Sequence, residues 1–412
     1  MQVNSQLSDR RTLGPWFIIE GIHSYAVTLF CYGCYFYASE VLRATDTQCL
    51  WLSAGWGLCY IFLSLLSGHL AARWGARNMI AGMSAGCVIT AAGGLVVLHF
   101  QNIWVLFAAM AAYNFTNTQI WPALESALTR SPGRMKLSSR ISRFNVVWSV
   151  SSSLAYFTSG PIMNLGWSLV FLIPAACALI ATFLSLGWAV PQDQLATDHI
   201  TEDSLNLNEG TGGAPRRRAG VLLLMAWTSN MLAYTAMNVI IPVMPFLTRL
   251  AAPGAGIWTA SLGSVWGFAR FGGFLLSLFW MGWRYRARWM LAAYVLLCTG
   301  FAMVLLFPGN LTALPGGQAL FGLGAAFVYA GALTYAMHLS SGSSGHAGIH
   351  EALIGMGITL GPAVGALAGN GSRSLSNIAG AVLSLLGLGA IVLFVFWYRG
   401  RREENGAQVS RE

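Results

Sequence analysis

The chain has 412 residues, of which 56% are hydrophobic and 9% are charged. Charged residues make up about 25% of an ordinary soluble domain, so this composition excludes a soluble globular protein. The formal net charge of +9 comes from arginines whose distribution along the chain follows a membrane topology, so no nucleic-acid partner is needed to explain it.

Apolar stretches of about 20 residues recur from one end of the chain to the other, which is the length of helix that crosses about 30 Å of hydrocarbon. A β-barrel would instead show segments of about ten residues with alternating hydropathy. We therefore predict an all-α polytopic membrane protein. Its twelve predicted spans cover residues 16–38, 50–72, 79–98, 103–125, 141–163, 167–189, 219–247, 256–281, 287–307, 312–337, 348–369 and 376–398.

A polar segment, residues 191–218, divides the spans six and six and has the composition of a flexible linker. It separates an N-terminal six-helix bundle (1–190) from a C-terminal one (219–398), which a polar tail (399–412) follows. With the N-terminus inside, 19 basic residues fall on the inner side, three on the outer side and Arg270 within a span, which accounts for all 23. The positive-inside rule then predicts that both termini and the linker are cytoplasmic, and we expect a bacterial inner membrane.

Strongly polar residues are concentrated in every third span. Spans 1, 4, 7 and 10 carry them in their interiors, often at helical spacing, whereas spans 3, 6 and 9 carry none. Polar side chains within a membrane face the interior of a helix bundle or a water-filled cavity, because exposure to lipid is costly. One alternative is that these stripes only join helices to each other. The three-helix interval favours a central cavity, for which the predicted solute contacts are Asn114, Asn117, Asn230, Tyr234, Asn238, Arg270 and Gln318.

Three ionisable residues inside the spans have predicted roles. Arg270 lies in the middle of span 8, where insertion of an arginine costs about 2.5–3.5 kcal/mol, so we expect it to contact an anionic or polar solute or to pair with Glu351. Glu20 and His23 stand one helical turn apart in span 1. Burial disfavours the charged form of a carboxyl group, which makes this pair a candidate proton site. A permanently hydrogen-bonded Glu20 in a uniporter is the alternative.

A weak internal repeat supports two halves. The stretch "GARNMIAG" after span 2 resembles "RARWMLAA" after span 8, and a run of small residues in span 5 resembles one in span 11. In span 11 the small residues are Gly357, Gly361 and Gly365, a spacing that lets helices approach closely. A duplicated six-helix unit would produce such pairs.

These residues carry a resemblance to a twelve-helix transporter of the major facilitator superfamily, over essentially the whole chain. The loop between spans 2 and 3 is similar to that family's basic loop at Gly68, Arg73, Gly75 and Arg77, although Ala72 replaces its acidic residue. Span 11 resembles a Gly–Pro helix motif of the family, with Gly357, Gly361, Pro362 and Gly365. The resemblance implies two pseudo-symmetric six-helix bundles around a central cavity.

The missing acid suggests a rearranged gate. In the family that acid lies against the start of span 11, and this chain has Glu351 at that position. A carboxylate is favoured in the first turn of a helix. We predict that Arg73 or Arg77 pairs with Glu351 when the cytoplasmic side is closed. The alternative is that the arginines only set the topology.

The sequence therefore predicts a secondary active transporter that moves a small polar or anionic solute by alternating access, with a proton as the candidate coupling ion. The alternatives are a multidrug efflux antiporter and a non-transporting receptor or scaffold with the same fold. Polar spans together with packing glycines favour transport. We expect a monomer in contact with membrane lipids, without enzymatic activity, cofactor, metal site or nucleic-acid partner.

The predicted topology has a direct test. Single cysteines introduced at Ser204, in the linker, and at Asn310, in an outer loop, should react with membrane-impermeant reagents from opposite sides of the membrane. Reaction of both cysteines from the same side would contradict the twelve-span arrangement.

Overall fold

The structure is a computed structural model, and it describes residues 2–74, 76–121, 124, 137–188, 216–340, 344–369 and 374–409. Within these ranges the chain forms twelve α-helices and two 3-10 helices. The helices of the N-terminal half are α1 (Gln2–Glu40), α2 (Asp46–Trp74), α3 (Ala76–Phe100), α4 (Ile103–Thr118), α6 (Leu137–Leu165) and α7 (Leu169–Trp188). Those of the C-terminal half are α9 (Arg216–Ala251), η2 (Gly256–Gly263), α10 (Ser264–Phe279), η3 (Met281–Trp283), α11 (Ala287–Leu306), α12 (Ala313–Ser340), α13 (Ser344–Ala368) and α14 (Ser374–Val409).

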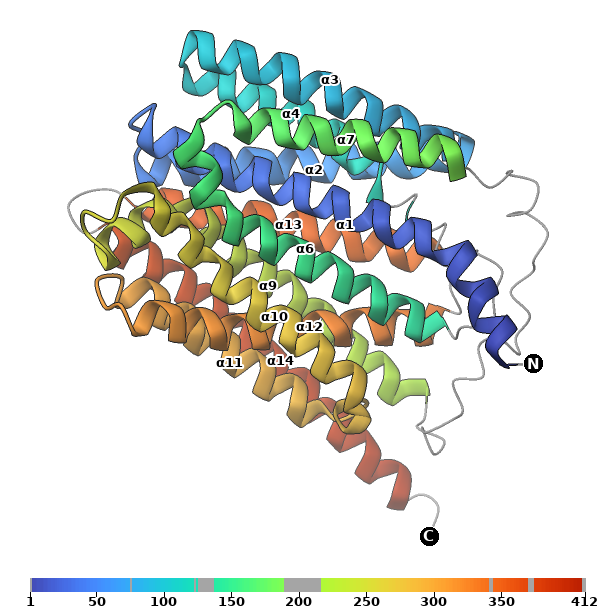
Figure 1. Cartoon of the computed structure of the whole chain (residues 1–412). Coiled ribbons are helices and arrows are strands. Elements are labelled where there is room, and N and C mark those ends of the chain that lie inside the picture. The colour runs from blue at the N-terminus through green and yellow to red at the C-terminus, as the bar shows by residue number, and fades with distance from the viewer. Residues whose placement is uncertain are drawn as a thin grey trace.

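The long helices run roughly side by side, and the start of α1 and the end of α14 lie at the same end of the bundle (Figure 1). We call this the terminal end, on the right in Figure 1, and the other the opposite end. The predicted linker falls almost entirely outside the described residues, as does Gly75 of the basic loop. Predicted span 8 begins as the 3-10 helix η2 before it continues as α10.

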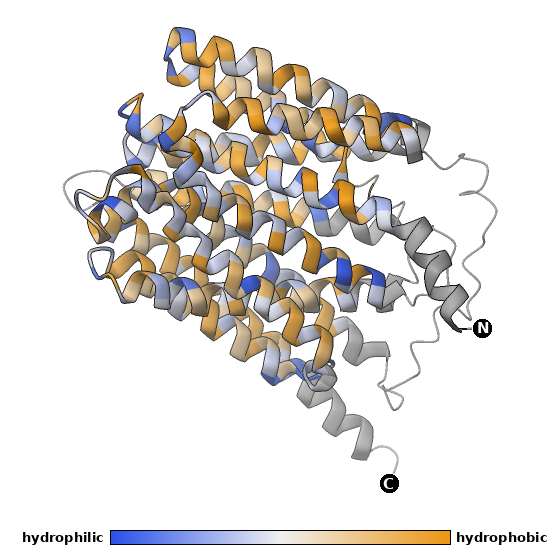
Figure 2. Cartoon of the chain, in the orientation of Figure 1, coloured by the Kyte–Doolittle hydropathy of each residue, from blue (hydrophilic) through white to orange (hydrophobic). Residues whose placement is uncertain are grey.

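The outer surface has the character of a lipid-facing surface. Among the described residues, ten helices are long and apolar enough to cross a membrane; α4 and α6 do not meet that criterion. Large apolar side chains such as Phe62, Leu95, Phe183 and Phe279 are exposed, and hydrophobic residues dominate the visible helix faces (Figure 2). Such a surface is unfavourable in water and suits a hydrocarbon environment. The predicted all-α membrane fold is confirmed.

The two halves meet mainly along α2 with α13 and along α6 with α10 and η2, and α9 also contacts α1 and α2. Small residues permit this contact. A Cβ atom added to Gly57 would lie 2.7 Å from the backbone of Ile358 and Thr359, and one added to Gly267 would lie 2.8 Å from Oγ of Ser153. Both distances are too short for a real side chain, so glycine is what allows these backbones to approach.

The glycines predicted to pack span 11 lie at helix contacts. A Cβ atom on Gly357 would meet Cβ of Tyr234 at 2.8 Å, and one on Gly361 would meet the main-chain carbon of Thr235 at 2.8 Å, both on α9. Gly365 faces Leu50 and Ile378 at 3.3 Å. Pro362 lies inside α13. The motif therefore joins α13 chiefly to its own half.

At the opposite end, contacts between the halves close the interface. Arg249 on α9 donates a hydrogen bond to Oγ of Ser39 at 2.7 Å and lies 3.6 Å from the Glu40 carboxylate, both on α1. The Tyr32 hydroxyl donates to the carbonyl of Ala260 at 2.8 Å. Similar bonds join Ser261 to Phe157 and Thr47 to Gly369. The structure therefore holds this end shut.

Replacement of Gly361 with leucine should destabilise the fold, because the new side chain would displace the backbone around Thr235. Overpacking of this kind typically costs about 1–3 kcal/mol. The readout is the thermal unfolding midpoint of the detergent-solubilised protein. Gly380 on α14 is the control, since a Cβ there would meet nothing within 4 Å. Equal midpoints for Gly361→Leu and Gly380→Leu would contradict the packing role.

Candidate functional site

A cluster of buried polar side chains joins α1 to α4. The Glu20 side chain is completely buried, and its Oε1 accepts hydrogen bonds from the Ser24 hydroxyl at 2.6 Å and from the Trp121 indole at 3.4 Å. His23 is buried, with its ring edge-on to Trp121 and its side chain next to that of Asn117. The structure therefore brings together Glu20, His23 and Asn117, which the sequence assigned to different roles.

This α1–α4 cluster is incompletely satisfied. Oε2 of Glu20, Nε2 of His23 and Oδ1 of Asn117 are buried without a hydrogen-bond partner. Asn114, one turn earlier on α4, donates from Nδ2 to the Trp56 carbonyl at 2.8 Å and leaves Oδ1 unpaired. A buried polar atom without a partner costs about 1–3 kcal/mol, and such groups mark positions where water, an ion or a ligand binds.

Arg270 on α10 lies at the interface between the halves, inside a group of aromatic rings. Its guanidinium carbon is 3.9 Å from the ring centre of Trp148 on α6 and between 5.6 and 5.8 Å from the rings of Trp266, Phe274 and Tyr329. The side chain is buried. Among the described residues, its guanidinium makes one long polar contact, of 3.8 Å from Nη1 to Sδ of Met237, and Nε has no partner.

In the part of the chain that the structure describes, no carboxylate pairs with Arg270. The alternative pairing with Glu351 is not observed, because Glu351 instead accepts a hydrogen bond of 2.5 Å from the Tyr60 hydroxyl. Cation–π contacts contribute about 0.5–2 kcal/mol and leave the hydrogen-bonding capacity of a guanidinium unused. Arg270 is thus a buried cation available to an anion.

Trp266, whose ring lies near Arg270, and Gln318, which contacts the Trp266 backbone, supply two further donors. Gln318 on α12 is fully buried, accepts a weak hydrogen bond from the backbone N–H of Trp266 at 3.4 Å, and leaves Nε2 without a partner. The indole Nε1 of Trp266 is also buried and unpaired. Trp266 therefore connects Arg270 with Gln318, two residues that the sequence predicted for solute contact, into one donor-rich site.

The polar residues of α9 are placed differently. Asn230 is buried with neither amide atom paired. Asn238 donates from Nδ2 to the carbonyl of Tyr234 on its own helix, and its own carbonyl accepts from Ser53 on α2. The Tyr234 ring lies 6.5 Å from that of Tyr329. Asn238 thus lies at a helix contact, whereas Tyr234 adjoins the rings around Arg270.

The predicted gate residues are only partly described. The side chains of Gly68 and Arg73, and all of Gly75, lie outside the described set. Arg77 is exposed to solvent. Glu351 is bonded to Tyr60 across the α2–α13 contact. The salt bridge between Glu351 and Arg73 or Arg77 stays a prediction for another conformation, which a double-mutant cycle on conformational populations would measure.

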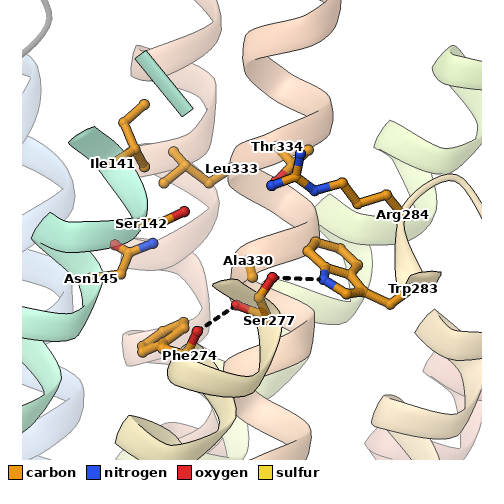
Figure 3. A pocket seen from close by; sticks show the side chains of 10 residues that line it. All are labelled: Ile141, Ser142, Asn145, Phe274, Ser277, Trp283, Arg284, Ala330, Leu333 and Thr334. Atoms are coloured by element: carbon orange, nitrogen blue, oxygen red, sulfur yellow. Dashed lines mark hydrogen bonds between the residues drawn. The ribbon is translucent and has the colours of Figure 1, made fainter. Parts of the chain in front are cut away.

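A narrow pocket lies between α6, α10 and α12, towards the terminal end (Figure 3). The polar residues of its lining include Ser142, Asn145, Ser277, Arg284 and Thr334, and the Trp283 indole donates to the carbonyl of Ser277 at 3.2 Å. Partial burial lowers the pKa of Arg284 from its ordinary value, although the guanidinium stays charged. Phe274 lines this pocket and also contacts Arg270, so the pocket adjoins the Arg270 site.

Sequence reasoning missed several of these contacts. In the sequence, Arg249 and Arg284 contribute only to the count of basic residues on each side of the membrane. No sequence pattern predicts the contact of Tyr60 with Glu351, and no spacing predicts that Arg284 lies near Asn145. The aromatic neighbours of Arg270 come from three helices, so no single stretch of sequence contains them.

Comparison with known proteins identifies the fold. The sequence profile described as the Major Facilitator Superfamily matches residues 16–269. No curated protein sequence matches the chain. The structure is similar to that of the nucleoside transporter NupG, with 14% sequence identity, a TM-score of 0.67, and coverage of 94% of this chain and 98% of that one.

Two further solved structures are similar. One is described as a proton dependent oligopeptide transporter, with 13% identity, a TM-score of 0.69, and coverage of 95% of this chain and 98% of that chain. The other is a bacterial homologue of the human lysosomal transporter Spinster in an inward-facing, unoccupied conformation, with 14% identity, a TM-score of 0.68, and coverage of 95% and 96%. At these identities the similarity identifies the fold and leaves the solute open.

Proposed function

Because the chain belongs to the major facilitator superfamily, we propose that it is a secondary transporter that moves a small anionic solute by alternating access. The observation that carries this proposal is Arg270, a buried cation at the interface between the halves without a carboxylate partner among the described residues. A guanidinium offers donors in a fixed fork that matches a carboxylate or phosphate group. The unpaired donors of Gln318 and Trp266 beside it support the same chemistry.

Alternating access requires two conformations in which the central site opens to opposite sides. The contacts of Arg249, Tyr32 and Ser261 close the opposite end in this structure. If both termini are cytoplasmic, as the arginine distribution predicts, the closed end faces outward. The pocket with Arg284 lies towards the terminal end, which is the side from which a solute would then reach Arg270.

The proposed coupling ion is a proton held by Glu20 and His23. This role is supported by the complete burial of Glu20, by its unpaired Oε2 and by the neighbouring unpaired Nε2 of His23. A proton on Glu20 would remove the cost of a buried negative charge. Uniport with a permanently hydrogen-bonded Glu20 is the competing account, and transport unaffected by a protonophore would favour it.

Two other functions are less well supported. A multidrug antiporter would be expected to bind hydrophobic cations, which the buried positive charge of Arg270 disfavours. A receptor or scaffold would have no use for unpaired polar atoms at the interface, since each lowers its stability. We therefore retain transport as the proposed function, in an integral membrane protein that acts on a small solute.

The proposal predicts a selective defect in Arg270→Gln. Hydrogen bonds to charged groups contribute about 1.5–3 kcal/mol, so uptake of the anionic solute into proteoliposomes should fall at least tenfold. Abundance in the membrane should stay near that of the wild type. The matched control is Arg399→Gln, which removes an exposed guanidinium where the membrane span of α14 ends. A panel of radiolabelled organic anions supplies the substrates, and equal uptake by both variants would exclude Arg270 from the solute site.

A further inference from the structure

Buried polar atoms without a partner are sorted by chemical kind between the two halves. Among the described residues of the N-terminal half, apart from Nε2 of His23, they are acceptor oxygens: Oε2 of Glu20 and Oδ1 of Asn114, Asn117 and Asn145. In the C-terminal half, N–H donors predominate among the described residues: Trp266 Nε1, Arg270 Nε, Arg284 Nε and Gln318 Nε2. Asn230 is the exception, since it leaves one donor and one acceptor unpaired.

The central part of this pattern does not depend on how amide groups are oriented. Glutamate and arginine side chains each carry only one kind of hydrogen-bonding group when charged, and an indole N–H only donates. The bond from Asn114 to the Trp56 carbonyl leaves its oxygen free, and the bond that Gln318 accepts from Trp266 leaves its nitrogen free. The classification of the unpaired atom as acceptor or donor therefore holds for five residues: Glu20, Asn114, Arg270, Trp266 and Gln318.

Glu20 and Arg270 lie next to the same segment of α6. Next to Glu20, a Cβ atom on Gly21 would lie 3.2 Å from Oγ of Ser151 and 3.4 Å from Val147. Arg270 stacks on Trp148, between those two residues in sequence. The two turns of α6 from Val147 to Ser153 thus contact α1 beside Glu20 and α10 beside Arg270.

We propose that the solute is a small zwitterion whose ammonium group binds the acceptors of the N-terminal half and whose carboxylate binds the donors around Arg270. This inference rests on the proposed function and adds the second charge of the solute. An ammonium group only donates and a carboxylate only accepts, so a zwitterion matches a site with separated acceptors and donors. A sugar hydroxyl both donates and accepts hydrogen bonds, so a sugar would not require acceptors in one half and donors in the other. A simple anion would leave the oxygens of Glu20 and Asn117 unpaired.

The role of Glu20 in proton binding is compatible with this solute. Its carboxyl group holds a proton in the empty protein, and the ammonium of the solute replaces that proton in the loaded one. A zwitterion that contacts both halves also binds most tightly when they are close together. A ligand shifts a conformational equilibrium only through such a difference in affinity. The solute would in this way favour closure around itself.

The test compares ligands that differ only in their charged groups. The full-length protein in detergent is screened by thermal unfolding against the twenty standard amino acids. The best of them is then compared with its decarboxylated amine and its deaminated acid, for example phenylalanine, phenethylamine and 3-phenylpropionate. We expect the zwitterion to stabilise the wild type at concentrations at least tenfold lower than either analogue, the fold-change that corresponds to about 1.4 kcal/mol.

Two variants test which half binds the ammonium group and which half binds the carboxylate. In Glu20→Gln the acid should bind as tightly as the zwitterion, because the partner of the ammonium is lost. In Arg270→Gln the amine should bind as tightly as the zwitterion. Arg399→Gln, which replaces an exposed residue, should keep the preference of the wild type. Retention of that preference in both Glu20→Gln and Arg270→Gln would overturn the proposal.

The outcomes separate this inference from the proposed function. If the acid stabilises the wild type as well as the zwitterion does, and this effect needs Arg270, the zwitterion is excluded while transport of an anion stands. If the amine binds as tightly as the zwitterion, or if no amino acid and no acid binds in a way that depends on Arg270, both proposals fail.

Discussion

The positive charge of Arg270 is the constraint around which the interface between the halves is arranged. It lies in a helix that crosses the membrane, where an arginine costs about 2.5–3.5 kcal/mol, and aromatic rings replace water around it. Cation–π contacts offset only part of that cost. Removal of a buried charge's partner typically costs about 3–5 kcal/mol, so a protein that leaves Arg270 unpaired gives up stability. Under the proposed function, an anionic solute would restore that stability.

The helix contacts around Arg270 allow this site to exist between two bodies. Glycines such as Gly57 and Gly267 bring backbones of the two halves together without interlocking side chains. Gly357 and Gly361 instead fix α13 to α9 within one half. The contact between α2 and α13 across the halves is equally close, and the hydrogen bond from Tyr60 to Glu351 adds to it.

The sequence predicted the fold, whereas the contacts of the candidate site residues could not be predicted from it. Hydropathy and arginine distribution suffice for helices, because lipid constrains every turn of a spanning helix. A charge inside a span, as at Arg270, is conspicuous for the same reason. The rings of Trp148 and Tyr329 meet Arg270 from α6 and α12, and no local pattern encodes such a contact. The Tyr60–Glu351 bond likewise depends on how the two halves dock.

An internal partner for Arg270 would test the central claim most directly. Met237 on α9 is buried, with its sulfur 3.8 Å from Nη1 of Arg270. A carboxylate at this position should pair with the guanidinium in the absence of any solute. The measurement is the unfolding temperature of the empty protein for Met237→Glu against Met237→Gln, which has the same shape without the charge. If Arg270 lacks an anion, Met237→Glu should unfold at the higher temperature. An equal or lower temperature for Met237→Glu would contradict the account.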